Sequence, residues 1–153
     1  SRGYRGTLSG SNGVDIVFLS AAEIVLGLKN GAADLGVTGE DLLRDAVPED
    51  DPSLDIVLRL GFGPADVAVA VPESWLDVAA MSDLVEISAR FHAKHGRRMR
   101  VATKYPGLTR RYFAEKGILG YRIVESAGAT EGAPATGAAG GPGGWPGPVA
   151  CAR

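Results

Sequence analysis

Short β-branched runs alternate with capped helical segments, and this alternation constrains the fold more than any other feature of the chain. Residues 14–19, apolar apart from Asp15, form a run short enough for a strand buried on both faces. Ser20 and Glu23 then have the spacing of a capping box, and Gly31 stands where a helix would end in a left-handed conformation. A strand followed at once by a helix is typical of α/β folds with a mainly parallel sheet.

The same order recurs along the chain. Further strands are expected at residues 35–37, 55–60, 66–71, 100–103 and 121–124. Helices are expected to follow Gly39, to begin at Ser82 as a cap and end at Gly96, and to run from about Leu108 to Gly117. The Gly-Phe-Gly-Pro turn at 61–64 predicts a hinge, so we expect a first α/β lobe over residues 1–63 and a second over 64–139.

The C-terminal residues depart from this pattern. Residues 128–153 hold eight of the 22 glycines and four of the nine prolines. Such a composition has too little apolar periodicity to offset its ordering entropy. We therefore expect residues 140–153 to be a disordered tail whose deletion leaves stability unchanged.

Composition excludes several classes of protein. Hydrophobic residues make up 45% of the chain and charged residues 22%, as in an ordinary globular protein. The net charge of −2 gives no electrostatic footprint for nucleic acid, and no apolar stretch is long enough to span a membrane. The single cysteine, Cys151, excludes a disulfide framework and favours the cytoplasm.

Polar residues follow the strand expected at 35–37. Thr38 and Gly39 form the turn, and Glu40 and Asp41 begin the next helix. Ligands of open α/β folds bind at this edge of the sheet, where carboxylates would accept hydrogen bonds from hydroxyl or amino groups rather than meet a phosphate. Helix capping alone explains the two acids equally well.

A second turn of this kind carries basic residues. Lys104 and Tyr105 follow the strand expected at 100–103, and Arg110 and Arg111 lie in the next helix. Cations beside backbone N–H groups suit an anion, although a solvated basic face is the simpler interpretation of Arg111. Because a parallel sheet places the ends of its strands on one edge, we expect the turns at Thr38 and Lys104 to face one cleft.

The sequence gives little support for a third binding turn, a metal site or covalent catalysis. Glu131 lies in a third strand-end turn that is small and polar. His92 and His95 have no carboxylate or thiol at metal-binding spacing, so no metal site is predicted. No serine or cysteine has a recognisable base, so the sequence indicates no catalytic nucleophile.

Taken in order, several blocks of the chain resemble the catalytic chain of ATP phosphoribosyltransferase, which opens histidine biosynthesis. The blocks are residues 15–24, 35–42, 60–63, 101–105, 108–113 and 125–134, within a resemblance that spans about 4–139. The short bacterial form is the most similar. The resemblance implies an α/β, two-lobed fold like the type II periplasmic binding proteins, here incomplete.

The resemblance also implies a reaction. The phosphoribosyl group of phosphoribosyl pyrophosphate would pass to N1 of ATP, with release of pyrophosphate and with Mg²⁺ accompanying that substrate. It implies a cytoplasmic oligomer, in some forms with a regulatory subunit. The substrate-binding residues would be Thr38, Gly39, Glu40, Asp41, Lys104, Tyr105, Arg110 and Glu131.

The chain departs from the family pattern in two places. The family begins with a Lys-Gly-Arg-like segment and later carries a Thr-Gly phosphate loop, whereas this chain begins near Tyr4 and holds Gly/Pro-rich sequence at 140–148. We expect a chain truncated at its N-terminus, with an aberrant tail, that makes little phosphoribosyl-ATP alone. The alternative is a solute-binding module, because the same two-lobed architecture also serves ligand capture.

Overall fold

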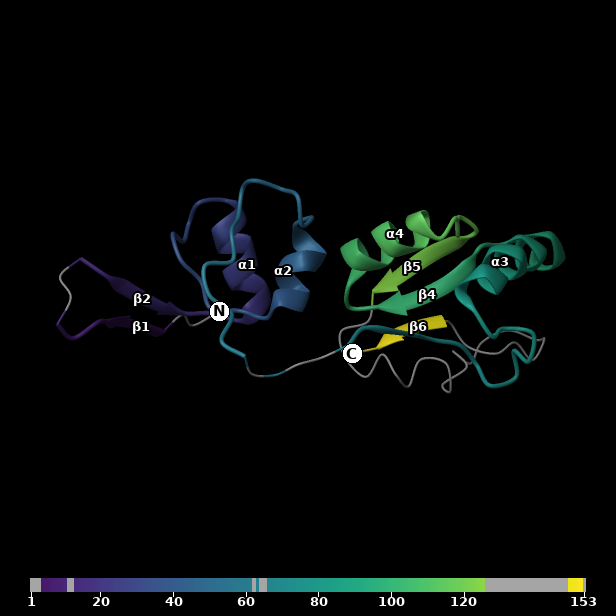
Figure 1. Cartoon of the computed structure of the whole chain (residues 1–153), viewed down its shortest axis with the longest axis horizontal. Coiled ribbons are helices and arrows are strands. Elements are labelled where there is room, and N and C mark those ends of the chain that lie inside the picture. The colour runs from purple at the N-terminus through teal and green to yellow at the C-terminus, as the bar shows by residue number, and fades with distance from the viewer. Residues whose placement is uncertain (1–3, 11–12, 62, 64–65, 126–148, 153) are drawn as a thin grey trace. The chain divides into compact units, whose positions relative to one another are not determined.

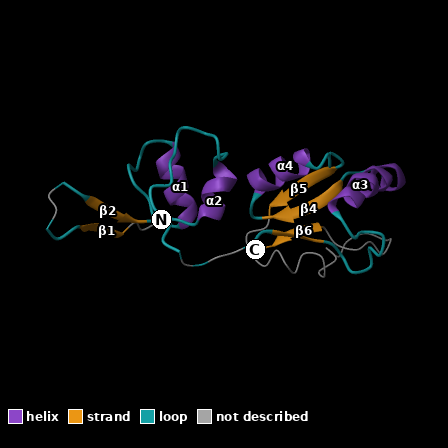
Figure 2. Ribbon diagram, in the orientation of Figure 1, coloured by secondary structure: helices purple, strands orange, loops and turns teal. Residues whose placement is uncertain are grey.

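The computed structural model describes residues 4–10, 13–61, 63, 66–125 and 149–152. The chain divides into two compact units, Ser1–Leu58 and Arg59–Arg153. The division falls close to the turn predicted at 61–64, of which residues 62 and 64 lie outside the described part. Each unit is an assembly of helices and strands (Figure 1; Figure 2), so the predicted α/β class is confirmed.

The first unit begins with a two-stranded hairpin. Strand β1 (Tyr4–Thr7) pairs antiparallel with β2 (Asp15–Phe18), and Tyr4 is opposite Phe18. The strand predicted at 14–19 is therefore present, but the expectation that it is buried on both faces is wrong. Its described neighbour is β1 alone, and Phe18 remains 63% exposed.

Helix α1 (Ala21–Lys29) follows as the sequence predicts. The Ser20 hydroxyl accepts from Glu23 N at 3.4 Å, and Ser20 N donates to Glu23 Oε2 at 2.9 Å. This reciprocal pair is the predicted capping box. Gly31 lies just beyond the helix with φ of 72°, a backbone conformation that glycine adopts without strain.

The strands predicted at 35–37 and 55–60 are absent from the described structure. A strand needs a hydrogen-bonding neighbour, and neither segment has one there. Their apolar side chains are consequently exposed, with Leu35 at 77%, Val57 at 82% and Leu58 at 73%. Helix α2 (Glu40–Ala46) begins directly after Gly39, as predicted.

The second unit is built on a four-stranded sheet in the order β3-β6-β4-β5. Its strands are β3 (Ala68–Ala70), β4 (Met99–Thr103), β5 (Tyr121–Glu125) and β6 (Val149–Ala152). Strand β4 pairs parallel with β5 and β6, whereas β3 pairs antiparallel with β6. The predicted parallel arrangement thus holds for part of this sheet.

Strand β6 corrects the prediction of a disordered tail over 140–153 for residues 149–152. Val149–Ala152 lies between β3 and β4, where it is the yellow strand of Figure 1. These four residues contain neither glycine nor proline, and they pair with strands on both sides. Residues 140–148 and 153 lie outside the described part of the chain.

One helix precedes β4 in the chain and another follows it. Helix α3 (Met81–His95) ends at Gly96 in the left-handed conformation, as predicted, and α4 (Pro106–Glu115) ends close to Gly117. Ser82, the predicted cap, lies inside α3 instead. Asp83 caps the helix, because its Oδ2 accepts from the backbone N–H groups of Ala79 and Ala80 at 2.9 and 2.8 Å.

The core of the second unit lies against one face of β4. Met99 and Val101, alternate residues of that strand, are at most 2% exposed. Side chains from both helices and from the turn before β5 complete this core, namely Leu84, Phe91, Phe113 and Ile118. Burial of these side chains holds β4 in place. No helix of the described residues is long and apolar enough to cross a lipid bilayer.

Candidate substrate-binding site

The first polar turn lies between α1 and α2. Thr38 is half-buried, and its hydroxyl donates to the Ala21 carbonyl at 3.2 Å. The lack of a side chain at Gly36 allows this segment to pack closely on α1, because a Cβ there would lie 2.6 Å from Ile24 Cγ2 and 2.9 Å from Leu28 Cδ1. The polar turn is therefore tied to the first turn of α1 by a hydrogen bond and to its middle by close packing.

The helix start at Gly39 is shaped by its acidic neighbours. No side chain caps Gly39, and a Cβ there would overlap the Asp41 carboxylate, which folds back toward the turn. Glu40 is exposed and forms an ion pair with Arg44, one helical turn later, at 3.5 Å. Glu40 therefore pairs within α2 and still presents carboxylate oxygen to solvent, whereas the Asp41 carboxylate lies close to Gly39.

The second polar turn follows β4. Lys104 is exposed, whereas Tyr105 is fully buried with 0% exposure. The Lys104 ammonium lies over the Tyr105 ring, with Nζ 4.8 Å from the ring centroid. This arrangement makes Lys104 the group of the turn that meets solvent, with Tyr105 as the platform beneath it.

Two buried threonines hold this turn, and the sequence interpretation did not identify them. Thr103 Oγ1 accepts from Tyr105 N at 2.9 Å and lies 3.1 Å from Thr109 Oγ1. Thr109 Oγ1 in turn lies 2.7 Å from the Tyr105 carbonyl oxygen. A threonine on each side of the Lys-Tyr-Pro segment was the available signal, since such hydroxyls bond to nearby backbone.

Basic residues continue along α4. Arg110 and Arg111 are exposed on this helix, which starts with Pro106 and has no acidic residue in its first turn. A helix start without acids suits an anion better than one with them. Glu131, predicted to bind substrate, lies outside the described residues.

The structure therefore brings the predicted residues together in two groups. Thr38, Gly39, Glu40 and Asp41 share one turn of the first unit, and Lys104, Tyr105 and Arg110 share one strand-to-helix junction of the second. The single cleft that would join these groups stays a prediction. Among the residues described, no three His, Cys, Asp or Glu side chains gather as metal ligands.

A sequence profile described as "HisG: ATP phosphoribosyltransferase" matches residues 20–141. This range covers most of the chain and includes both polar turns and Glu131. The chain belongs to the HisG family. The predicted family membership is thus confirmed.

HisG relatives match nearly the whole chain. An ATP phosphoribosyltransferase of Rhodopseudomonas palustris (strain BisB18) is 54% identical over 139 residues, which cover 91% of this chain and 43% of that protein. Another, from Chelativorans sp. (strain BNC1), is 55% identical over 90% of this chain and 60% of that protein. The chain thus spans about half the length of these relatives.

A solved HisG structure shows the same fold. The "ATP phosphoribosyl transferase (HisG:HisZ) complex from Thermotoga maritima" superposes with a TM-score of 0.57 and 19% sequence identity. The match covers 97% of this chain and 61% of that one. At this identity the likeness concerns the fold alone.

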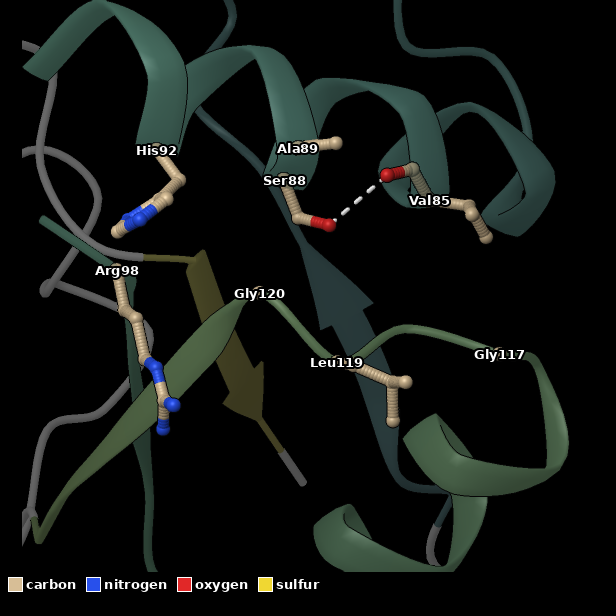
Figure 3. A pocket seen from close by; sticks show the side chains of 8 residues that line it. All are labelled: Val85, Ser88, Ala89, His92, Arg98, Gly117, Leu119 and Gly120. Atoms are coloured by element: carbon tan, nitrogen blue, oxygen red, sulfur yellow. Dashed lines mark hydrogen bonds between the residues drawn. The ribbon is translucent and has the colours of Figure 1, made fainter. Parts of the chain in front are cut away.

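A cavity of about 500 Å³ lies elsewhere in this HisG-family chain (Figure 3). It is lined from α3, from Arg98 before β4, and from the Gly117–Gly120 turn before β5. Ser88 already donates to the Val85 carbonyl at 2.9 Å, and Arg98 is directed away from α3. The cavity is at the N-terminal ends of β4 and β5, whereas Lys104 follows the C-terminal end of β4, so it includes none of the predicted site residues.

Proposed function

We propose that this chain supplies substrate-binding elements of an ATP phosphoribosyltransferase. In that reaction N1 of the ATP adenine attacks the anomeric carbon of phosphoribosyl pyrophosphate. A carbon–nitrogen bond forms, the bond to pyrophosphate breaks, and the leaving group takes the electron pair. The product, phosphoribosyl-ATP, would begin L-histidine biosynthesis in the cytoplasm.

This reaction depends on positioning of the two substrates and on electrostatic stabilisation, and not on a nucleophilic side chain of the protein. Departure of pyrophosphate leaves positive charge on the sugar, and both substrates are polyanions that must be aligned. Lys104 and Arg110 would bind anionic groups, with Tyr105 supporting the Lys104 ammonium. This division of roles agrees with the buried position of Tyr105 and the exposure of both cations.

The acidic turn suits the uncharged parts of the substrates. Thr38, Gly39, Glu40 and Asp41 would meet ribose hydroxyls or the adenine amino group, which donate hydrogen bonds that carboxylates accept. Glu131 would also take part in binding ATP and phosphoribosyl pyrophosphate. Phosphates would be repelled from Glu40 and Asp41, which places them at the Lys104 turn instead.

Mg²⁺ belongs to this proposal as part of the pyrophosphate substrate, whose hard oxygens are the ligands it prefers. We also propose the two-lobed arrangement of the type II periplasmic binding proteins, with the acidic and basic turns facing one cleft. The whole protein would be an oligomer that includes a regulatory subunit, by analogy with the HisG:HisZ complex of Thermotoga maritima. The transferase names of the relatives do not favour a solute-binding module.

The observation that carries the proposal is the family match over residues 20–141, which includes both polar turns. The test is a chimera in which this chain replaces the matching segment of the Chelativorans relative. With ATP, phosphoribosyl pyrophosphate and Mg²⁺, the chimera should form phosphoribosyl-ATP and pyrophosphate in equal amounts. Lys104→Ala in the chimera should lower kcat/KM at least about tenfold, since one charge-assisted contact contributes about 1.5–3 kcal/mol.

Two controls accompany this test. Lys116→Ala removes an exposed lysine that pairs with Glu115 on α4, and it should leave turnover unchanged. A chimera that folds but yields no phosphoribosyl-ATP would exclude the proposal. Equal turnover of the Lys104→Ala and parent chimeras would exclude the role of Lys104.

A further inference from the structure

The turn after β4 holds the backbone of Lys104 in place through a hydrogen bond between its two neighbours in the chain. Thr103 accepts from the N–H of Tyr105, so the hydrogen bond spans Lys104 and closes a tight turn around it. Thr103 is 0% exposed and Tyr105 is 0% exposed, so water does not compete with this bond. The backbone on both sides of Lys104 is thereby fixed.

Thr109 closes the same turn from the helix side. Its Oγ1 is 2.7 Å from the Tyr105 carbonyl oxygen and 3.1 Å from Thr103 Oγ1. Each hydroxyl has one proton, so the shorter contact marks Thr109 as donor to Tyr105 and leaves Thr103 to donate to Thr109. Two hydroxyls thus hold the N–H and the carbonyl of a single residue, Tyr105.

Fixing Tyr105 also fixes the surface beneath Lys104. The Lys104 Nζ lies 4.8 Å from the Tyr105 ring centroid, and this fully buried ring is held by the packing around it as well as by the backbone that the threonines fix. An exposed lysine normally samples many rotamers and loses this freedom when it binds an anion. A lysine seated on an immobile ring has less freedom to lose.

We propose that Thr109, acting with Thr103, is a positioning residue that places the Lys104 ammonium for binding of an anionic substrate group. The proposal rests on the proposed function in its assignment of Lys104 to substrate. Thr109 is 3% exposed and its hydroxyl bonds to the Tyr105 carbonyl oxygen, so it acts through Tyr105 and Lys104 and not by contact with substrate. Its methyl group fills space, and its hydroxyl supplies the positioning.

The test separates the hydroxyl from the methyl group in the full chain. Thr109→Val keeps the volume and removes the hydroxyl, whereas Thr109→Ser keeps the hydroxyl. Tyr105 retains a partner for its carbonyl in both variants, because Thr109 N also donates to it at 3.0 Å. Thr109→Ala serves the same purpose should the valine variant not fold.

The first readout needs no substrate. Because Lys104 Nζ lies over the Tyr105 ring, the ring should shift the NMR signals of the Lys104 ε-methylene protons upfield in the parent chain. In Thr109→Val these signals should move toward the position of a free lysine, and in Thr109→Ser they should stay. Unchanged Lys104 signals in Thr109→Val would overturn the proposal, whatever its effect on melting temperature.

The second readout is calorimetric binding of ATP and of phosphoribosyl pyrophosphate with Mg²⁺. Thr109→Val should weaken binding about two- to tenfold, the range expected for ordering one long side chain, and Thr109→Ser should restore it. Loss of binding in Thr109→Ser as well as in Thr109→Val would count against a role for the hydroxyl. Absence of binding in the parent chain, with the Lys104 signals behaving as expected, would contradict the proposed function while supporting the positioning.

Discussion

The Oγ1 atoms of Thr103 and Thr109 lie 3.1 Å apart in the interior of the second unit and join the end of β4 to the first turn of α4. Both residues are at most 3% exposed. Because the two hydroxyls also hold the backbone of Tyr105, loss of either affects a buried network rather than a single contact.

Thr103→Val should destabilise the second unit. It removes the acceptor of the Tyr105 N–H in a fully buried site, and leaving a buried donor without an acceptor costs about 1–3 kcal/mol. Thr103→Ser keeps the acceptor and should lose less. Urea unfolding followed by circular dichroism measures both, and equal stability of Thr103→Val and the parent chain would contradict the network.

Gly36→Ala should destabilise the first unit. The new Cβ would lie 2.6 Å from Ile24 Cγ2, a branch close to the backbone of α1, and overpacking of this kind costs about 1–3 kcal/mol. Gly27→Ala is the matched control within α1, since its Cβ would lie 3.5 Å from Ala33 in ordinary contact. The control should gain about 0.5–1 kcal/mol from helix propensity, so the two substitutions should have opposite signs in denaturant unfolding.

Acidification should loosen the start of α3. Backbone hydrogen bonds from Ala79 and then Ala80 lower the pKa of the Asp83 carboxyl below its ordinary value. A pKa that is lower in the folded state means that the cap stabilises α3 above the unfolded-state pKa and is lost as pH falls through the folded-state pKa. The protection factor of the Ala80 N–H in hydrogen exchange, taken relative to the unfolded chain at the same pH, should therefore fall in that acidic range.

Variants of the same helix start identify the responsible side chain. Asp83→Ala should remove this pH dependence of the protection factor and lower the protection factor at neutral pH. Ser82→Ala should change both much less, because the Ser82 hydroxyl donates one long hydrogen bond of 3.4 Å to Asp83 Oδ1, whereas Oδ2 accepts the two shorter bonds from backbone N–H groups. The assignment would be wrong if Ser82→Ala matched Asp83→Ala.

Deletion of residues 149–153 should destabilise the second unit. Strand β6 separates β3 from β4, and each ladder hydrogen bond contributes about 0.5–1.5 kcal/mol, so the loss should be about 2–5 kcal/mol. Val149→Pro, which removes one N–H and restricts the backbone, should act in the same direction. Melting temperatures that match the parent chain in both variants would show that β6 does not support the sheet.

Exposed apolar side chains of the first unit should make the chain self-associate. Leu35 and Val57 are 77% and 82% exposed in segments without strand partners in the described structure, a surface that favours association. Leu35→Lys with Val57→Lys should shift sedimentation toward the monomer without lowering the free energy of unfolding. An unchanged distribution would place the contact elsewhere.

Local sequence determined the helices and their ends. Ser20 with Glu23, and Gly31 and Gly96 beyond the helix ends, act over one turn of chain, so their spacing alone predicted α1 and the end of α3. Spacing was insufficient where two neighbouring residues could both cap the same helix. Ser82 and Asp83 both suit the start of α3, and the geometry at Ala79 and Ala80 decided for Asp83.

The candidate site divides in the same way. Thr38 to Asp41 and Lys104 to Arg110 were predicted because polar residues after an apolar run are visible in the sequence. That Tyr105 is buried beneath Lys104, and that Thr103 and Thr109 hold it, depends on how α4 packs against β4. A residue type at a strand end does not reveal which side chain meets solvent.

The sequence by itself determined the α/β class, the positions of the helices and the polar turns that follow the strand-like runs, because capping and periodicity are local. Tertiary structure decided which apolar runs become strands, since a strand exists only where another part of the chain pairs with it. Residues 35–37 have the composition of a strand and lack a described neighbour, whereas Val149–Ala152 follows Gly/Pro-rich sequence and still becomes the strand between β3 and β4.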